Sequence, residues 1–383
     1  MGNRKLNQLE KVCRVFRITG KMLGYRLITA GNINTTYRVS FREDGVRSEY
    51  IVQRINTYVF KNPEDVMWNI KLITDHIRAK LEKTEVNVNN YVLKFCETEE
   101  GKNLYISEDK SAWRVYNFIT EAVAYDICND LSILKASGTA FGRFQNQLAD
   151  FDASALHVTI PDFHYTPLRL KTFFEHVKEE PCGRVKEIPE ELEYIRSMED
   201  TVGQLNDMLA KGEVPLRVTH NDTKTNNVLI HATTNEPLAV IDLDTVMPGI
   251  AMHDFGDAVR FAANVAEEDE PDTSKVQLDM ERFRAFAEGF IGQTAGALWE
   301  KEIEPMALGA VTITVELAVR FLDDYITGDK YFKTNYPGHN LVRARCQLAL
   351  AKDMMNHLDE MNATVQQIAE VAKAAQKQAA AQA

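Results

Sequence analysis

Cysteine is scarce in this chain. The cysteines are odd in number, widely separated and never arranged as C-x-x-C: Cys13, Cys96, Cys128, Cys182 and Cys346. A disulfide framework requires an even set of cysteines, and a structural zinc site requires closely spaced ligands. The pattern therefore excludes both and is typical of a protein in the reducing cytoplasm.

Long hydrophobic runs are also missing. No apolar stretch approaches the roughly 20 residues of a transmembrane helix. The first residues, Met1 to Leu6, contain no apolar signal-peptide core, and Leu6 stands where an acylation signal has Ser or Thr. We expect a soluble, cytoplasmic protein.

Positive charge is in the minority, with 44 Lys and Arg against 56 Asp and Glu and a formal net charge of −12. This balance argues against nucleic acid or an anionic membrane as a partner. Apolar residues make up 45% of the chain and charged residues 26%, as in ordinary globular proteins. Because single hydrophobic cores rarely grow beyond roughly 250–300 residues, we expect two lobes in a chain of 383 residues.

The spacing of apolar residues divides the chain into two parts. A first helix is predicted over 4–18. Short alternating runs between Gly24 and Asn117 then predict an antiparallel sheet, with one helix inserted at about 64–80. Helical spacing dominates afterwards. The predicted fold is α+β and bilobal, with a small β-rich N-lobe over 1–116, a larger helical C-lobe over 117–360 and an Ala/Gln-rich tail over 361–383.

The most informative segment runs from His220 to Asp242. Its first eight residues read H-x-D-x-x-x-x-N, in which the Asp is Asp222 and the Asn is Asn227. Two short apolar strands joined by a polar turn follow. In phosphoryl transfer, Asp222 would take or orient the proton of an acceptor hydroxyl, while Asn227 and Asp242 would hold magnesium ions on the nucleotide phosphates. A polar turn with an Asx-type cap is the alternative. The flanking strands favour a kinase with a bilobal, protein-kinase-like fold.

A second motif, Asp254-Phe255-Gly256, spells the D-F-G signature of protein kinases, whose aspartate binds magnesium. Asp254 lies 32 residues beyond Asp222 and opens an apolar helical pattern. An aspartate at a helix start usually accepts backbone N–H groups. We therefore predict that Asp254 braces the catalytic segment and that Asp242 is the metal ligand.

A glycine-rich G-x-G-x-x-G loop is absent. Segment 31–36 precedes the second predicted strand and is the candidate phosphate loop, in which backbone N–H groups and hydroxyls donate to phosphate oxygens. Its candidate contact residues are Asn32, Asn34, Thr35 and Thr36. An ordinary turn between two strands is the alternative for this segment.

Two further nucleotide contacts are expected in the N-lobe. Arg54 on the third predicted strand is the expected phosphate cation, at a position where kinases usually have Lys. Its acidic partner stays open between Asp65 and Asp75. Adenine is expected at the hinge that follows the sheet, where backbone groups of Asn117 and Ile119 would bind the purine edge.

The motifs at 220–227, 241–249 and 254–261 resemble those of the aminoglycoside phosphotransferase and choline kinase superfamily. They resemble more closely the bacterial N-acetylhexosamine 1-kinase family. Further matching stretches are 31–37, 113–116, 141–146, 320–325 and 336–343. The resemblance covers roughly residues 20–355, which is nearly all of the globular part.

The resemblance implies that ATP and magnesium are used to phosphorylate the anomeric hydroxyl of N-acetylglucosamine or N-acetylgalactosamine. It makes Asp222 the base, places magnesium on Asn227 and Asp242, and places the phosphates on Arg54 and the 31–36 loop. The chemistry agrees, because the anomeric hydroxyl is more acidic than other sugar hydroxyls and a carboxylate suffices to deprotonate it late in a loose transition state.

The acceptor pocket is expected near the end of a late helix and its following loop. The expected sugar contacts are Asp222, Asp244, Arg320, Asp324 and Tyr331. Asp244 is expected to point the same way as Asp242 in an extended strand, where it would contact metal or sugar, and Asn34 would reach either phosphate or acceptor. The alternatives are that Arg320 is a buried partner of a helix carboxylate and that Tyr331 is a core aromatic. His220 is expected to be structural.

Two other functions stay open. A kinase of another small hydroxyl compound, such as an amino alcohol, homoserine or an aminoglycoside, would need acidic and aromatic residues around a cationic acceptor. A nucleotide-binding pseudokinase would normally have lost one of Asp222, Asn227 and Asp242, and all three are present. For either kinase we expect a monomer whose partner is a small molecule.

Overall fold

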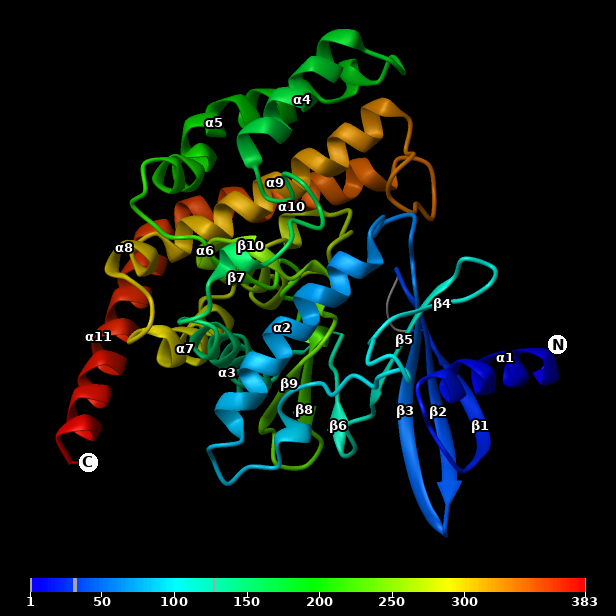
Figure 1. Cartoon of the computed structure of the whole chain (residues 1–383). Coiled ribbons are helices and arrows are strands. Elements are labelled where there is room, and N and C mark those ends of the chain that lie inside the picture. Colours follow the sequence, from blue (N-terminus) through cyan, green and yellow to red (C-terminus); the bar gives the residue numbers. More distant parts are fainter. Residues whose placement is uncertain (1, 30–32, 127, 383) are drawn as a thin grey trace.

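The computed structural model describes residues 2–29, 33–126 and 128–382. Its N-lobe contains a five-stranded antiparallel sheet in the order β1-β2-β3-β5-β4 (Figure 1). The strands are β1 (Lys21–Ile28), β2 (Thr35–Glu43), β3 (Val46–Ile55), β4 (Tyr105–Ile106) and β5 (Ala112–Asn117). The turn between β2 and β3 is formed by Asp44 and Gly45, both with positive φ, as the sequence Asp-Gly predicts.

Two helices cover opposite faces of this sheet. Helix α1 (Gly2–Val15) buries Leu9 and Val12 against the outer face, in one cluster with Val39 and Trp113. Helix α2 (Pro63–Leu81) lies between the sheet and the helical part of the molecule (Figure 1). The predicted helix over 64–80 is confirmed, because its apolar spacing buries one side of α2 in a second cluster.

The C-lobe is mainly helical. Its longer helices are α3 (Leu131–Gln147), α4 (Thr166–Glu179), α5 (Pro189–Ala210), α6 (Ala251–Ala262), α7 (Met280–Thr294), α9 (Met306–Thr327), α10 (His339–Asn356) and α11 (Leu358–Gln382), with the short α8 (Glu300–Ile303). Helix α9 is buried on nearly every side and contacts α4, α5, α6, α10 and α11. The predicted α+β fold with a β-rich N-lobe and a helical C-lobe is thereby confirmed.

Two small sheets in the C-lobe position the catalytic segment. One joins β7 (Arg217–Thr219) to β10 (Met247–Gly249). The other contains β6 (Ala122–Val123), β8 (Val228–His231) and β9 (Pro237–Val240), and β8 and β9 form the predicted hairpin. The Ala/Gln-rich end of the chain is helical within α11, which buries Met361 and Val365.

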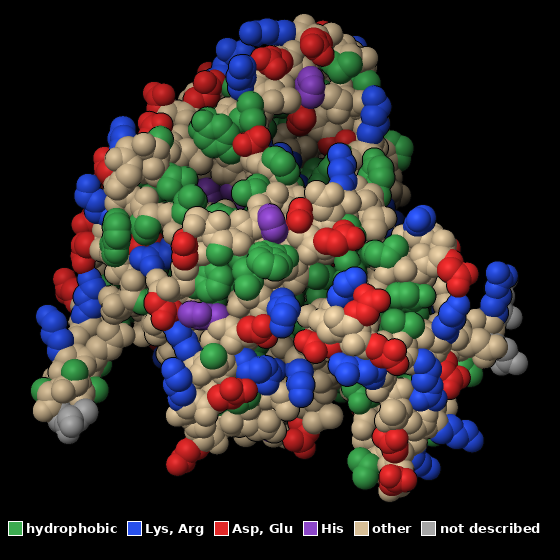
Figure 2. All heavy atoms as spheres, in the orientation of Figure 1, with side chains coloured by type: hydrophobic (Ala, Val, Ile, Leu, Met, Phe, Trp, Pro, Cys, Tyr) green, Lys and Arg blue, Asp and Glu red, His purple; other side chains and the backbone are tan. Residues whose placement is uncertain are grey.

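Surface properties agree with the composition. On the face shown in Figure 2, acidic and basic side chains are interspersed over both lobes. Within the described ranges, no helix has the length and hydrophobicity needed to cross a bilayer. All five cysteines are free thiols.

Candidate active site

The catalytic segment starts where β7 ends. His220 is fully buried, its Nε2 lies 2.9 Å from the carbonyl oxygen of Ile241, and its ring packs edge-on against Phe141 and Phe144. The predicted structural role of His220 is confirmed by these contacts. Through Ile241, the histidine holds the catalytic segment against the strand that leads to Asp242.

Asp222 and Asn227 are in direct contact. The Asn227 side chain donates to the carbonyl oxygen of Asp222 at 2.8 Å and to its carboxylate at 3.2 Å. Lys224 lies 2.8 Å from the other carboxylate oxygen. With a quarter of its side chain exposed (25%), Asp222 is held in position and remains accessible to an acceptor.

Asp242 joins this pair across the hairpin, because the Ile241 N–H donates to the Asn227 carbonyl at 2.9 Å. Asp242 itself lies beyond the end of β9 and has a left-handed backbone, with φ 58°. Its side chain is exposed to solvent. Desolvation by the surrounding protein, then the charges of Asp244 and Asp222, raise the pKa of Asp242 to about 6. Asp222 and Asp244 thus lie near enough to Asp242 for their charges to act on it.

This arrangement fits a magnesium ion. Across the described part of the chain, no group of three or more His, Cys, Asp or Glu side chains is arranged to hold a metal by itself. Magnesium usually takes only one or two protein ligands and completes its shell with water and phosphate oxygens. The amide of Asn227 and the carboxylate of Asp242 supply such hard oxygen ligands.

The D-F-G aspartate braces the catalytic segment. The Asp254 carboxylate is buried and accepts the backbone N–H groups of His220 and Asn221, each at 2.8 Å, and the side-chain amide of Gln145 at 2.8 Å. The predicted role is therefore confirmed. The expected helix start was wrong: α6 begins at Ala251, so Asp254 caps the catalytic segment and not its own helix.

The glycine of the same motif is required by packing. A Cβ atom on Gly256 would lie 2.3 Å from the backbone oxygen of Gly309, because α6 and α9 touch there. Asp257, one residue later, accepts the backbone N–H of Thr223 at 2.8 Å and pairs with Arg260 at 2.9 Å. Asp254 and Asp257 thus support the loop that carries Asp222, whereas Gly256 lets α6 pack against α9.

Arg54 does not lie with these residues, contrary to our expectation. It pairs with Thr35 in the sheet register and lines an exposed cavity beside α1, on the outer face of the sheet. Side chains alternate along a strand, so its neighbour Gln53 points to the opposite face. Arg114 of β5 and Arg38 of β2 both lie on that inner face. The Nε of Arg114 donates to Gln53 at 2.9 Å, and Arg38 pairs with Glu49.

The predicted phosphate loop is described from residue 33 onward, so Asn32 lies outside the described residues. Asn34 accepts the Asn56 N–H at 3.0 Å and donates to Asp244 at 2.5 Å. The Thr36 hydroxyl accepts from Gln53 at 3.0 Å and faces the inside of the sheet with it. Thr35 belongs to the outer face with Arg54, away from Asp242.

The hinge residues have partners within the protein. The Asn117 N–H donates to the Lys94 carbonyl at 3.1 Å, and the Asn117 side chain accepts the Lys94 N–H at 2.7 Å. Phe118 donates its N–H to Glu49 at 3.2 Å, and Ile119 is buried in the core. A purine edge at this hinge therefore has to use backbone groups other than the N–H of Asn117 and Phe118.

Two of the expected sugar contacts are buried structural residues. Asp244 is 3% exposed and pairs with Arg114, so the expectation that it contacts the acceptor is not supported by its position. It also lies in a 3₁₀ turn and not, as expected, in an extended strand with Asp242. Asp324 accepts the N–H groups of Lys330, Tyr331 and Phe332 at 2.7–2.9 Å, so both of its carboxylate oxygens already have hydrogen-bond donors within the protein.

Arg320 and Tyr331 remain available at the expected acceptor side. The Arg320 guanidinium lies over the rings of Phe163 and Phe332, at 5.7 and 5.5 Å, and pairs with no carboxylate among the described residues. Tyr331 is 72% exposed and packs edge-on against Phe332, so it is not a core aromatic. Both alternatives considered for these residues from the sequence are thus wrong.

A polar cluster that the sequence did not reveal connects this region to the catalytic segment. Glu316 of α9 is buried and lies 2.9 Å from His164, 2.6 Å from the Thr166 hydroxyl and 3.6 Å from Arg169. These contacts lower the pKa of Glu316 to about 2 against the effect of burial. His164 in turn approaches the carbonyl oxygen of Asn221, at 3.4 Å. The available signal was an acid within the otherwise uncharged stretch 306–319 of this helix.

The sequence matches the phosphotransferase enzyme family over residues 24–286. The chain belongs to this family. This phosphotransferase is similar in fold to a microcompartment-associated aminopropanol kinase, with a TM-score of 0.60, 12% identity, and 93% of this chain and 98% of that chain covered. It is also similar to choline kinase from Cryptosporidium parvum, with a TM-score of 0.53, 14% identity, and 94% and 98% covered. At these identities the likeness shows a shared fold.

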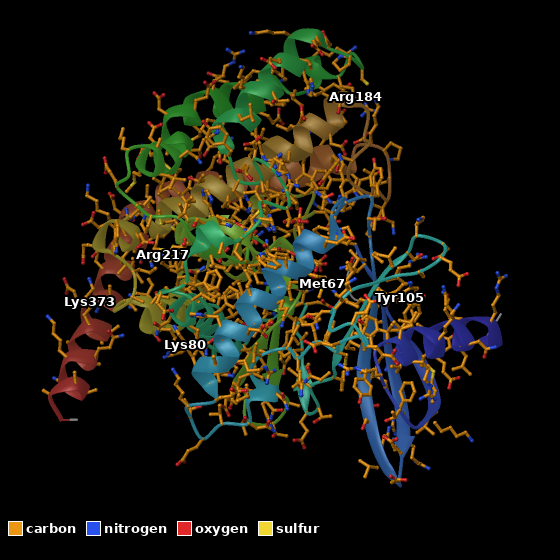
Figure 3. The ribbon with its side chains drawn as sticks, in the orientation of Figure 1. Met67, Lys80, Tyr105, Arg184, Arg217 and Lys373 are labelled. Atoms are coloured by element: carbon orange, nitrogen blue, oxygen red, sulfur yellow. The ribbon has the colours of Figure 1, made fainter. Side chains whose placement is uncertain are left out.

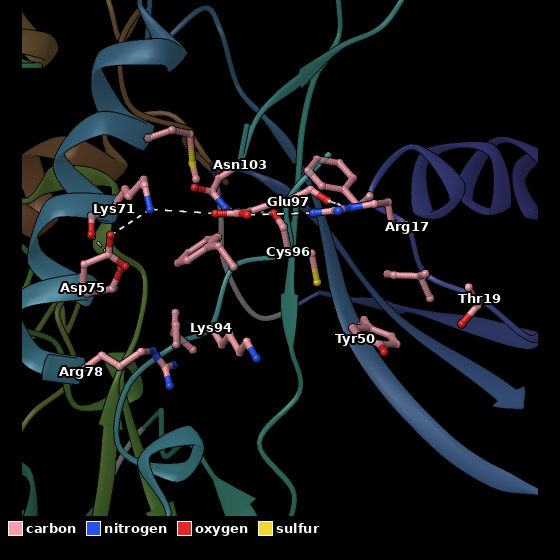
Figure 4. A pocket seen from close by; sticks show the side chains of 16 residues that line it. Arg17, Thr19, Tyr50, Lys71, Asp75, Arg78, Lys94, Cys96, Glu97 and Asn103 are labelled. Atoms are coloured by element: carbon pink, nitrogen blue, oxygen red, sulfur yellow. Dashed lines mark hydrogen bonds and ion pairs between the residues drawn. The ribbon is translucent and has the colours of Figure 1, made fainter. Parts of the chain in front are cut away.

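The phosphotransferase also has a separate cavity of about 470 Å³ between α2, segment 93–97 and the chain that follows α1 (Figure 4). Within it Lys71 pairs with Asp75 at 2.8 Å and approaches Glu97 at 3.9 Å. None of Asp222, Asn227 and Asp242 lines this cavity. It therefore lies outside the candidate active site.

Proposed function

We propose that this phosphotransferase transfers the γ-phosphoryl group of ATP to the anomeric hydroxyl of an N-acetylhexosamine, giving the sugar 1-phosphate. Asp222 hydrogen-bonds to the anomeric hydroxyl and accepts its proton as the bond to phosphorus forms. Lys224 and Asn227 hold the Asp222 carboxylate in place. Magnesium on Asn227 and Asp242 would neutralise charge on the phosphates.

The observation that carries the choice of acceptor is the charge of the region around Glu316, which is linked to Asn221 through His164. Burial and the nearby charge of Arg320 lower the pKa of Arg169, so two guanidinium groups lie close together there. The buried acid of the region, Glu316, already has His164, Thr166 and Arg169 as partners, whereas Arg320 has no carboxylate partner among the described residues. A cationic acceptor would be repelled, whereas hydroxyl and acetamido oxygens accept hydrogen bonds from arginine.

The aromatic side chains around Arg320 support the same acceptor. Phe163 and Phe332 hold the guanidinium between them, and the exposed Tyr331 borders them. Flat apolar rings beside fixed donors suit a sugar ring, which has apolar C–H faces and a polar edge.

A second candidate is a kinase of amino alcohols. Two of the similar folds are named for an aminopropanol kinase and a choline kinase. Asp162, an exposed acid beside Arg169, is the group that an ammonium acceptor would use.

The experiment is ATP turnover with magnesium against N-acetylhexosamines, other free sugars, amino alcohols, homoserine and aminoglycosides, with the phosphate position read by phosphorus NMR. An anomeric phosphate on an N-acetylhexosamine is the expected result. Turnover only with amine acceptors would replace the proposal by the second candidate. Nucleotide binding without turnover of any acceptor would indicate a pseudokinase.

A further inference from the structure

A buried ion pair connects the N-lobe sheet to the chain that follows Asp242. The Arg114 guanidinium and the Asp244 carboxylate bond to each other with side chains 2% and 3% exposed. Arg114 belongs to β5, and Asp244 lies two residues beyond the candidate metal ligand. The two residues are 130 positions apart in sequence, so the pair forms only when the lobes come together.

Both partners of this pair are held from further sides. On the sheet, Gln53 accepts from Arg114 at 2.9 Å and donates to Thr36 at 3.0 Å. On the other side, Arg114 contacts the sulfur of Met67, labelled on α2 in Figure 3, at 3.8 Å. The planar guanidinium is therefore fixed in direction, which a lysine ammonium would not be.

The second oxygen of Asp244 reaches the phosphate loop. Asn34, immediately before β2, donates to it at 2.5 Å and accepts the Asn56 N–H at 3.0 Å. The same carboxylate therefore receives Arg114 on one oxygen and the loop on the other. Helix α2 is attached to this chain segment as well, because Asn69 donates to the Val246 carbonyl at 2.9 Å.

We propose that Arg114 is a positioning residue for phosphoryl transfer, which acts through Asp244 to hold the metal-binding segment and the phosphate loop in register. Arg114 itself touches neither metal nor substrate in this role. The role rests on the proposed function only in that Asp242 binds magnesium.

The test measures the affinity for ADP with and without magnesium, which requires no acceptor. The variants are Arg114→Gln, Arg114→Lys and Asn34→Ala. Arg345→Gln is the matched control, because it breaks the ion pair with Glu191 between α10 and α5, away from the cleft. Melting temperatures are recorded for every variant.

We expect magnesium to tighten ADP binding by the wild-type protein. In Arg114→Gln this gain should fall by about 10- to 100-fold, as when an outer-shell partner of a metal ligand is removed, while magnesium-free ADP binding stays unchanged. Arg114→Lys should recover part of the gain because it restores the charge. Asn34→Ala should lose a smaller part at an unchanged melting temperature, and Arg345→Gln should keep the full gain.

A purely structural role would lower only the melting temperature. A full magnesium gain in both Arg114→Gln and Asn34→Ala would therefore overturn the proposal. If Arg114→Gln does not fold, Asn34→Ala decides alone, since it removes one partner of Asp244 and leaves the ion pair intact. Absence of any gain in the wild type would overturn the metal assignment itself, and with it this role. If the protein does not phosphorylate an N-acetylhexosamine, the test of Arg114 still holds, because it measures only ADP and magnesium binding.

Discussion

The carboxylate of Asp254 accepts the backbone N–H of Asn221 at 2.8 Å, immediately before the candidate base. Asn221 has a left-handed backbone, with φ 64°, which a residue other than glycine rarely adopts. The buried acid therefore stabilises a strained turn that directs Asp222 toward the cleft. The aspartate of the D-F-G motif, Asp254, therefore has a structural role in this protein: it fixes the backbone just before Asp222.

Asp222→Asn should lower kcat by about 10²- to 10⁴-fold, the usual contribution of a general base. The amide keeps the shape of the carboxylate but accepts no proton. Because Asp222 is partly exposed and its ion pair with Lys224 is at the surface of the cleft, the melting temperature should change little. The check is kcat together with thermal unfolding, and a variant that unfolds would show a structural role instead.

Asp254→Asn and Asp242→Asn should affect different properties: the first should affect stability, and the second should affect the magnesium requirement. The first replaces an acceptor of two backbone N–H groups by a group with one acceptor oxygen, so it should cost about 1–3 kcal/mol of unfolding free energy. The second should raise the magnesium requirement in a folded protein. Denaturant unfolding and magnesium titration of both variants check this, and loss of magnesium dependence in a stable Asp254→Asn would reverse the two assignments.

The magnesium requirement should depend on pH. The pKa of Asp242 is raised to about 6 in the metal-free protein, so a proton competes with the metal below that pH. The half-saturating magnesium concentration should be flat above about pH 7 and rise about tenfold per pH unit well below pH 6, as expected for one competing proton. A magnesium titration from pH 5 to 8 checks this, and a flat profile throughout would contradict it.

Substitutions of Arg320 and Asp324 should have distinguishable effects, the first on acceptor binding and the second on the stability of the loop at 330–332. Arg320→Gln should raise the acceptor KM by roughly 10- to 100-fold, the effect of losing a hydrogen bond from a charged donor, and leave the ATP KM unchanged. Asp324→Asn should instead lower stability, because its carboxylate fixes three N–H groups of the loop at 330–332. Steady-state kinetics and melting curves distinguish them, and an equal ATP effect in Arg320→Gln would place that residue elsewhere.

Buried His253 should make the protein sensitive to mild acid. Burial and the neighbouring His164 lower the pKa of His253 to about 3, and its Nε2 has no partner among the described residues. As pH falls below about 6.5, the unfolded chain binds a proton that the folded chain refuses, so stability is lost by up to about 1.4 kcal/mol per pH unit.

The check is the difference in unfolding free energy between the wild type and His253→Leu from pH 5 to 6.5. Glu316, with a pKa lowered to about 2, does not contribute in this range, and Asp242, with a pKa raised to about 6, contributes equally to both proteins. His253→Leu should have a shallower slope than the wild type. Identical slopes would show that His253 is not the group responsible.

The sequence by itself determined the part of the site that is local in the chain. Asp222, Asn227 and the hairpin toward Asp242 lie within 21 residues, and their relation depends on a turn and two short strands. Alternating apolar residues and turn residues specify such an element without distant contacts. The roles of His220 and Asp254 as structural residues with backbone partners were also predicted, although Asp254 lies inside α6 and not at its start.

Only the tertiary structure decided which charged side chains face the cleft. A shift of one position along a strand turns a side chain to the other face, so the pattern of β3 did not distinguish Arg54 from Gln53. The covering of the outer face by α1 and the inner one by α2 made that choice. Asp244 and Asp324 are buried by partners that the local pattern does not show. Whether a carboxylate is free to bind a metal or substrate, or is bonded within the protein, therefore depends on which donor groups the fold places beside it.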